Sequence, residues 1–280
     1  SSGAVPGTVM TTSGGLRLVD AGRATTIQDL GRRGLASLGV PRAGAVDRSS
    51  HDLANRLVGN EVDAATLETN GGLIVEATRA LVVATSPSGD RHTLAPGARL
   101  RVDPPRDMMW AYLAVRGGVA VTPVLGSRSH DTLSGLGPAP LMSGTELPVG
   151  ADPGTALVAD QAPQRVRDRV VRLWPGPRVD RFADPLGVLV GRTWTVSGAT
   201  SRVGSRLQRG DFTLVSTDRL ASEGLVPGAI QVTPSGEPVV MLANHPTTGG
   251  YPVVAVVDEL DLSIVAQAPP GATVRFRLAT

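Results

Sequence analysis

The sequence contains no lysine, so its 27 basic residues are all arginine. This absence excludes a Schiff-base lysine, a phosphate-loop lysine and a biotinylated lysine, and a partner would have to supply any of these groups. The planar fork of arginine instead suits recognition of carboxylates or phosphates at individual sites. Because the net charge is only +2 and the arginines are interspersed with Asp and Glu, we predict no nucleic-acid-binding surface.

Cysteine is also absent, which excludes disulfides, thiolate nucleophiles and cysteine-based zinc sites. The four histidines, His51, His92, His130 and His245, show no metal-binding spacing, so we predict no metal site. Aromatic residues make up only 3% of the chain, too few for a surface that binds nucleic acid by stacking.

Long hydrophobic runs are missing as well. No run reaches the roughly 18 apolar residues of a membrane span, so we expect no membrane partner. Residues 1–13 lack the basic start and apolar core of a signal peptide. We interpret them as a disordered lead or expression remnant, with Met10 as a candidate natural start, and predict a cytoplasmic protein.

Glycine and proline are abundant, at 34 and 22 residues, and break the chain into short segments. Closely spaced short strands separated by turn residues predict a mainly β protein. Helices are expected only at residues 47–58, where Asp47 caps the start, and at residues 201–207. Strands are predicted at residues 16–19, 73–77, 80–84, 99–102, 110–115, 156–158, 169–174, 193–196, 230–232, 239–242, 253–257 and 273–278.

A weak internal repeat predicts two similar modules. Residues 94–102 and 268–276 both read as a Pro-Gly turn entering a final strand, and residues 72–84 and 229–243 both read as strand-turn-strand. The polar segment 160–168 is the predicted linker. We therefore expect modules at residues 14–160 and 169–280.

Two arginine-bearing segments are candidate anion sites. In residues 39–51 a helix N-terminus next to Arg42 and Arg48 favours an anion, although the simpler interpretation is that Asp47 caps the helix. In residues 196–207, Arg202 and Arg206 are four apart and would share one helical face, to hold a phosphate or carboxylate or to form a solvated face with internal ion pairs.

A glycine-paired turn is the most distinctive segment. Thr247 and Thr248 supply hydroxyls, Gly249 and Gly250 allow a close backbone approach, and Tyr251 adds a ring with a polar tip. The turn is interpreted either as the wall of a pocket or as a tight connection. The adjacent Ser, His and Asp of residues 129–131 predict a hydrogen-bonded loop, because catalytic triads draw their members from separated segments.

Motifs in fixed order over nearly the whole chain resemble the family of KipA and the C-type subunits of 5-oxoprolinase, also called allophanate hydrolase subunit 2 or the biotin-dependent carboxyltransferase domain family. The matching motifs are TIQDLGR (26–32), GVP (39–41), GAVD (44–47), ANRLVGN (54–60), LE (67–68), VRGG (115–118), LGSRS (125–129), DT (131–132), SRVGSRL (201–207), SEG (222–224), GAIQV (228–232) and TTGGYP (247–252).

The resemblance implies two cyclophilin-like β-barrel modules with a few short helices. It implies one subunit of an ATP-dependent 5-oxoprolinase, which converts 5-oxoproline to glutamate with a KipI-like B-type subunit and an A-type hydrolase subunit. ATP would be bound by or with the partner, with no covalently bound cofactor. The alternatives are a carboxyltransferase component of a biotin-dependent urea-carboxylase or allophanate system, or a non-catalytic KipA-type regulator that binds a KipI-like kinase inhibitor.

One motif departs from the resemblance. The family commonly carries Asp-Arg-Gln before the glycine-paired turn, whereas this chain has Asn244, His245 and Pro246. An amide thus replaces a carboxylate, so this corner lacks the ionisable acid that the family carries there. The predicted site combines Asp47 and Asn244 as catalytic residues with substrate-binding residues Arg42, Arg202, Arg206, Gln231, Thr247, Thr248, Gly249, Gly250 and Tyr251.

Overall fold

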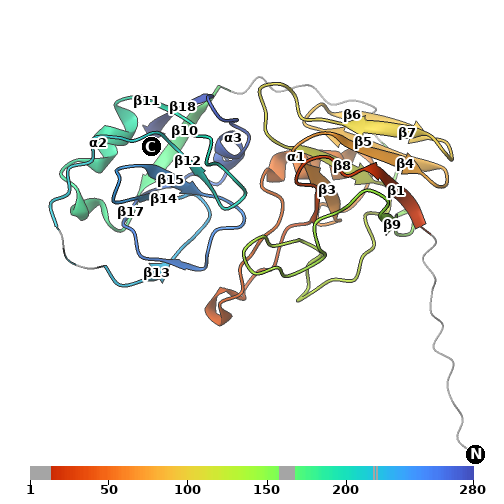
Figure 1. The fold of residues 1–280 in the computed structure, drawn as a ribbon, viewed down its shortest axis with the longest axis horizontal. Coiled ribbons are helices and arrows are strands. Elements are labelled where there is room, and N and C mark those ends of the chain that lie inside the picture. The colour runs from red at the N-terminus through yellow and green to blue at the C-terminus, as the bar shows by residue number, and fades with distance from the viewer. Residues whose placement is uncertain (1–13, 158–167, 217, 219) are drawn as a thin grey trace, which may run out of the picture.

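The structure, a computed structural model, describes residues 14–157, 168–216, 218 and 220–280. We call residues 14–157 the N-terminal half and residues 168–280 the C-terminal half. The two halves lie side by side, with helices α1 (Arg48–Leu57) and α3 (Leu262–Ala266) where they meet (Figure 1). The mainly β prediction is confirmed, since short strands dominate both halves. The predicted lead 1–13 and, except for Asp168, the predicted linker lie outside the described residues.

The N-terminal half contains two antiparallel sheets packed around one core. One sheet has the order β7-β4-β1-β9 and the other β2-β3-β8-β5-β6. The core lies between them and includes Leu16, Leu67, Val75 and Leu113. The strands are β1 (Gly14–Asp20), β2 (Thr26–Gln28), β3 (Thr66–Thr69), β4 (Leu73–Ala77), β5 (Leu81–Ser86), β6 (Asp90–Leu94), β7 (Arg99–Val102), β8 (Ala111–Val115) and β9 (Glu146–Pro148), with a 3-10 turn η1 (Ala36–Leu38).

The C-terminal half is built on a seven-stranded sheet of order β11-β18-β10-β17-β14-β15-β12, antiparallel except for the β10–β18 pair. Its separate core includes Leu173, Trp194 and Ile230. The strands are β10 (Val170–Pro175), β11 (Thr193–Thr195), β12 (Gly204–Arg206), β14 (Ala229–Val232), β15 (Pro238–Met241), β17 (Val253–Val257) and β18 (Thr273–Leu278). The half also has η2 (Val179–Arg181), α2 (Pro185–Val190) and a two-stranded arm of β13 (Glu223–Gly224) and β16 (Thr248–Gly249).

Helix α1 confirms the helix predicted at residues 47–58. Asp47 is its N-cap, accepting a hydrogen bond from the Ser50 backbone N–H at 3.1 Å. The helix places Ala54 and Leu57 in a third apolar cluster, which also holds Leu242 and Ala266 of the C-terminal half. The two halves therefore share a buried apolar contact.

The helix predicted at residues 201–207 is wrong, because residues 204–206 form strand β12 and pair with β15. Val203, Gly204 and Ser205 are weak helix formers, and the ladder supplies their backbone with hydrogen bonds. Arg202 and Arg206 therefore do not share a helical face. The strand predicted at residues 156–158 is also not formed in its described part, Ala156 and Leu157.

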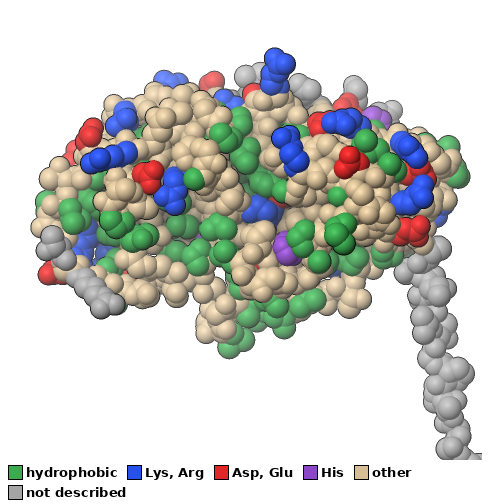
Figure 2. Space-filling model, viewed as in Figure 1, with side chains coloured by type: hydrophobic (Ala, Val, Ile, Leu, Met, Phe, Trp, Pro, Cys, Tyr) green, Lys and Arg blue, Asp and Glu red, His purple; other side chains and the backbone are tan. Residues whose placement is uncertain are grey.

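Charge is distributed without a large patch of one sign on the face shown in Figure 2, where arginines and acidic side chains are interspersed over both halves. Within the described residues, no helix has the length and apolar character needed to cross a membrane.

Candidate functional site

A pocket of about 390 Å³ lies between the two halves. The N-terminal half contributes the loop that precedes α1 and the first residue of that helix, and the C-terminal half contributes the end of β17 and the start of α3. The lining residues are Leu30, Arg42, Ala43, Gly44, Ala45, Val46, Arg48, Trp174, Val226, Pro227, Ala243, Val256, Val257, Asp258, Glu259, Leu262 and Ser263.

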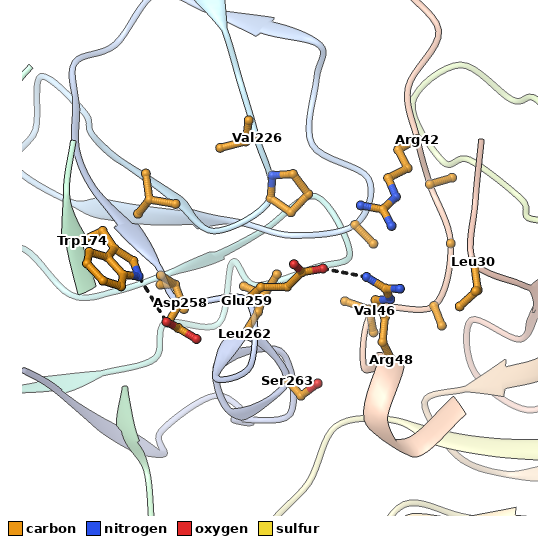
Figure 3. Close-up of a pocket in the computed structure, with 17 residues that line it drawn as sticks. Leu30, Arg42, Val46, Arg48, Trp174, Val226, Asp258, Glu259, Leu262 and Ser263 are labelled. Carbon is orange, nitrogen blue, oxygen red and sulfur yellow. Dashed lines mark hydrogen bonds and ion pairs between the residues drawn. The ribbon is translucent and has the colours of Figure 1, made fainter. Parts of the chain in front are cut away.

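Most charged groups in this pocket are paired (Figure 3). Arg48 Nη1 donates to Glu259 Oε1 at 2.7 Å across the two halves. Asp258 accepts from Trp174 Nε1 at 3.1 Å and lies 3.1 Å from Arg172 Nη2. Arg42 is the exception: its side chain makes no hydrogen bond or ion pair with any residue that the structure describes.

The environment of Arg42 disfavours its positive charge. Burial lowers the pKa of Arg42, the nearby charges of Arg48 and Arg33 lower it further, and Glu259 opposes them. A guanidinium stays protonated despite such a shift because its ordinary pKa lies far above neutral pH. The pocket therefore presents an unneutralised cation among apolar walls, which suits an anionic ligand.

The Arg42 loop is held against the segment that begins at Asp29. Arg32 N donates to Arg42 O at 2.7 Å, and Ala45 N donates to Asp29 O at 2.9 Å. Gly44 has a positive φ of 98°, and a side chain there would meet the Leu30 backbone at 3.0 Å. Glycine is thus required for the loop to approach this closely.

Asp47 lies outside the pocket lining and is completely buried. Besides capping α1, its carboxylate accepts from Gln267 Nε2 of the C-terminal half at 2.9 Å. Gln267 Oε1 in turn accepts from the backbone N–H groups of Met109 and Trp110, at 3.0 and 2.8 Å. Asp47 therefore serves as a cap and as a link between the halves.

A second buried polar chain crosses between the halves close to the pocket wall. Glu68, in β3, accepts from Tyr112 Oη at 2.7 Å and forms an ion pair with Arg202. Arg202 also donates to the pocket residue Gly44 at 2.6 Å and to Asn244 Oδ1 at 2.5 Å. Asn244 donates onward to Asp131. We call Glu68, Arg202, Asn244 and Asp131 the buried chain.

The charged side chains of the buried chain are shielded from solvent, and this burial shifts pKa values. Arg202 is 4% exposed and Glu68 0% exposed, so neither charge is solvated by water. Burial lowers the pKa of Arg202 to about 9, which leaves it protonated at neutral pH beside the Glu68 carboxylate. Burial also lowers the pKa of His245, and nearby Arg42 contributes to that shift. The imidazole of His245 is thus kept neutral.

The glycine-paired turn does not line the inter-half pocket, although it pairs with the segment just before the lining residue Val226. Thr248 and Gly249 form the short strand β16, and Gln231 Nε2 donates to the Tyr251 carbonyl at 2.9 Å. Gly250 and Tyr251 instead line a smaller pocket of about 240 Å³ within the C-terminal half. Thr247 accepts through its carbonyl from Leu225 N at 3.0 Å.

The structure brings part of the predicted set together. Arg42 lines the inter-half pocket, and Arg202 contacts that pocket through Gly44 and continues to Asn244. Arg206 does not join them, because its Nη1 donates to Glu237 at 2.8 Å on the surface. Gln231 and residues 247–251 also lie outside the pocket lining.

The predicted loop around His130 is hydrogen-bonded, as expected. Asp29 accepts from the hydroxyls of Ser127 and Ser129, both at 2.6 Å, and from the Arg128 backbone N–H. Asp131 accepts from Ser134 N at 2.8 Å. The Ser and Asp side chains are thus occupied in shaping the loop.

Sequence reasoning missed Glu68, Tyr112, Asp131 and Gln267 as members of the buried polar contacts. Glu68 offered one signal, since it is a carboxylate within a strand whose neighbours are apolar or threonine. Its burial from both sides comes from β2 and β8, which pair with β3. Only the tertiary structure shows that Arg202, far along the chain, neutralises it.

Comparison with known families identifies the class of protein. The family model described as carboxyltransferase domain, subdomain A and B, matches residues 38–278. The chain is 36% identical to the C subunit of 5-oxoprolinase from Escherichia coli, over 93% of this chain and 90% of that protein. The chain therefore belongs to the carboxyltransferase-domain family that includes this 5-oxoprolinase subunit.

Solved structures agree with this assignment. The crystal structure of TTHA0988 matches with a TM-score of 0.86 and 31% identity, over 99% of this chain. The urea carboxylase of Kluyveromyces lactis matches with a TM-score of 0.84 and 26% identity, over 95% of this chain. The chain spans 60% of TTHA0988 and 27% of the urea carboxylase, so both are longer proteins.

Proposed function

We propose that this chain is the C-type subunit of an ATP-dependent 5-oxoprolinase, which converts 5-oxoproline to glutamate. The observation that carries the proposal is the 36% identity to the C subunit of E. coli 5-oxoprolinase over nearly the full length of both chains. The reaction phosphorylates the lactam oxygen and then hydrolyses the activated ring. A cytoplasmic location fits the ATP requirement.

Within this reaction, the chain's share is binding and orientation. Arg42 offers a charge-assisted contact to an anionic group, and the apolar wall of Val46, Val226 and Leu262 excludes water around it. Arg202 and Asn244 hold the pocket wall through Gly44 and the buried chain. Asp47 fixes the start of α1, from which Arg48 enters the pocket.

ATP does not fit the inter-half pocket. A triphosphate carries several negative charges, whereas the pocket, as formed by the described residues, offers one guanidinium without an ion-pair partner and also presents Asp258 and Glu259. We therefore assign ATP to the partner subunits. The partners proposed are a KipI-like B-type subunit and an A-type hydrolase subunit, and the chain should release no glutamate alone.

The test is reconstitution with the two other subunits from the same source. The complete set with ATP and 5-oxoproline should release glutamate, and omission of this chain should abolish release. Glutamate formation at the same rate without this chain would contradict the proposal.

A carboxyltransferase function is the second candidate, favoured by the family description and by the match to K. lactis urea carboxylase. Because the chain has no lysine, the biotinylated carrier would be another polypeptide. Transfer of labelled bicarbonate to urea, with a biotin carboxylase and carrier supplied, would favour this function. The absence of both activities, together with tight binding of a KipI-like protein, would favour a non-catalytic regulator.

A further inference from the structure

The inter-half pocket contains two donors that the protein itself does not satisfy. The Arg42 side chain has no hydrogen-bond or ion-pair partner in the part of the chain that the structure describes. Arg48 uses Nη1 for Glu259, but its Nε is buried and lacks a hydrogen-bond partner among the same residues. A buried donor without a partner is destabilising, so Arg48 Nε favours an added acceptor, and the half-buried Arg42 guanidinium offers that acceptor a positive charge without an ion-pair partner in the described part of the chain.

The charges of the pocket limit the acceptor to one negative charge. Arg48 pairs with Glu259, and Asp258 shares Arg172 with Asp261, so among the described residues Arg42 is the one lining cation without an ion-pair partner. The two acidic residues lie on the same lining and would repel a polyanion. A single carboxylate matches the remaining charge, and a planar guanidinium can bind its two oxygens at once.

The remaining pocket walls indicate the character of the ligand's uncharged part, which we call its body. Leu30, Val46, Val226, Val257 and Leu262 make the pocket largely apolar. Its volume of about 390 Å³ is enough for a small molecule but limits the size of the body. A compact apolar body next to one charged group therefore fits both the walls and the cation.

We propose that this pocket binds a small monocarboxylate with a compact apolar body, and that Arg42 holds its carboxylate. The proposal rests on the proposed function for its biological ligand, because 5-oxoproline is one member of this chemical class. The two halves each supply part of the site: Arg42 and Arg48 come from the N-terminal half, whereas Val226 and Leu262 come from the C-terminal half. The site is complete only when the halves are docked.

Calorimetric titration of the full chain tests the proposal with four probes: 5-oxoproline, cyclopentanecarboxylate, the uncharged amide of 5-oxoproline, and inorganic phosphate. Both carboxylates should bind at one site, the amide should bind at least about tenfold more weakly, and phosphate should not compete. Arg42→Gln should weaken carboxylate binding by at least about tenfold and leave amide binding unchanged.

Arg33→Gln is the matched control, because it removes the same charge from an exposed neighbour outside the pocket and should weaken carboxylate binding far less than Arg42→Gln does. Val226→Trp narrows the pocket from its rim, where Val226 is 52% exposed, and should weaken carboxylates and amide alike. Melting curves of each variant check that it is folded.

Unchanged carboxylate binding by folded Arg42→Gln would overturn the proposal, as would tighter binding of phosphate or no saturable binding of either carboxylate. These results are separable from the proposed function. Arg42-dependent binding of cyclopentanecarboxylate without glutamate release by the reconstituted complex would retain the pocket and reject the oxoprolinase. Glutamate release without Arg42-dependent binding would retain the oxoprolinase function and reject the proposed role of the pocket.

Discussion

Arg202 and Arg206 lie four residues apart but differ in what surrounds them. Arg202 is buried, pairs with Glu68 and contacts Asn244 and Gly44. Arg206 is half-exposed and pairs with Glu237 at the surface. A buried ion pair is sensitive to loss of one partner, whereas a surface pair contributes little to stability.

We predict that Arg202→Ala destabilises the fold by about 3–5 kcal/mol, because it leaves the Glu68 carboxylate buried without its partner. The matched change Arg206→Ala should lower the free energy of unfolding by no more than about 1 kcal/mol. Urea unfolding of both variants measures the difference. Similar losses in the two variants would show that the buried ion pair has no special role.

Asn244 tests the departure from the family motif. Its amide nitrogen donates to Asp131 and its oxygen accepts from Arg202. We predict that Asn244→Asp destabilises the fold, because the new carboxylate would face Asp131 and could no longer donate when ionised. Burial and the Asp131 carboxylate raise the folded-state pKa of the new carboxyl, and they outweigh Arg202, whose charge is already paired with Glu68. Stability should therefore fall further as pH rises through the range above about 4.

The check on Asn244→Asp is its free energy of unfolding relative to the parent at a mildly acidic and a mildly basic pH. The deficit should be larger at the basic pH, where the unfolded carboxyl is ionised. A deficit that is larger at the acidic pH, or a variant more stable than the parent throughout, would contradict the placement of Asn244 beside Asp131.

At the scale of elements, one side chain links the polar start of α1 to the end of α3, beside the apolar contact that the two helices share. Gln267 follows α3 and links the Asp47 cap of α1 to the backbone before β8. We predict that Gln267→Ala destabilises the fold by about 2–4 kcal/mol, because the buried Trp110 N–H loses the side-chain acceptor and the buried Asp47 carboxylate loses one of its donors. Gln208→Ala, at an exposed position, is the control and should be close to neutral. Thermal unfolding separates them, and equal melting temperatures would refute the link.

The burial of His51, in α1, predicts that the stability of the fold depends on pH. Burial lowers the pKa of His51, opposed by Asp52 and by its contact with the Val62 carbonyl, and burial also lowers the pKa of His245. The folded state therefore favours neutral imidazoles, whereas the unfolded chain binds protons below about pH 6.5. Stability should be complete above that pH and decline as pH falls below it.

Urea unfolding between about pH 7.5 and about pH 5.5 measures this effect, in a range above the ordinary carboxyl pKa values. His51→Gln should reduce the slope of stability against pH, even though it lowers the stability itself. A slope that is unchanged in His51→Gln, or a parent protein that gains stability on acidification, would contradict the prediction.

Local patterns predicted elements well where apolar residues dominate. The predicted strands at residues 73–77, 99–102, 253–257 and 273–278 coincide with β4, β7, β17 and β18. Strands β2, β3 and β12 were missed because they are short and polar, and their pairing partners lie far along the chain. The wrong helix prediction at residues 201–207 has the same cause. The four-residue spacing of the arginines suggested a helix, but hydrogen bonds with the distant strand β15 hold residues 204–206 as a strand.

At the scale of the whole molecule, the family resemblance predicted the mainly β fold and family membership. It could not predict the inter-half pocket, because docking of the halves brings Arg42 next to Val226 and Leu262. Arg42 itself was selected for its position before a helix, and the structure places it in that pocket. Arg206 and the turn at 247–251 were selected by chemistry alone and do not line it.

The central claim is that this chain is one required subunit of a 5-oxoprolinase. The most direct measurement is the ratio of glutamate formed to ADP formed by the reconstituted subunits, with and without this chain. We predict equal amounts of glutamate and ADP in the complete complex, and no glutamate when this chain is omitted. Full glutamate production by the other subunits alone, or ADP formation by the complete complex without any glutamate, would contradict the claim.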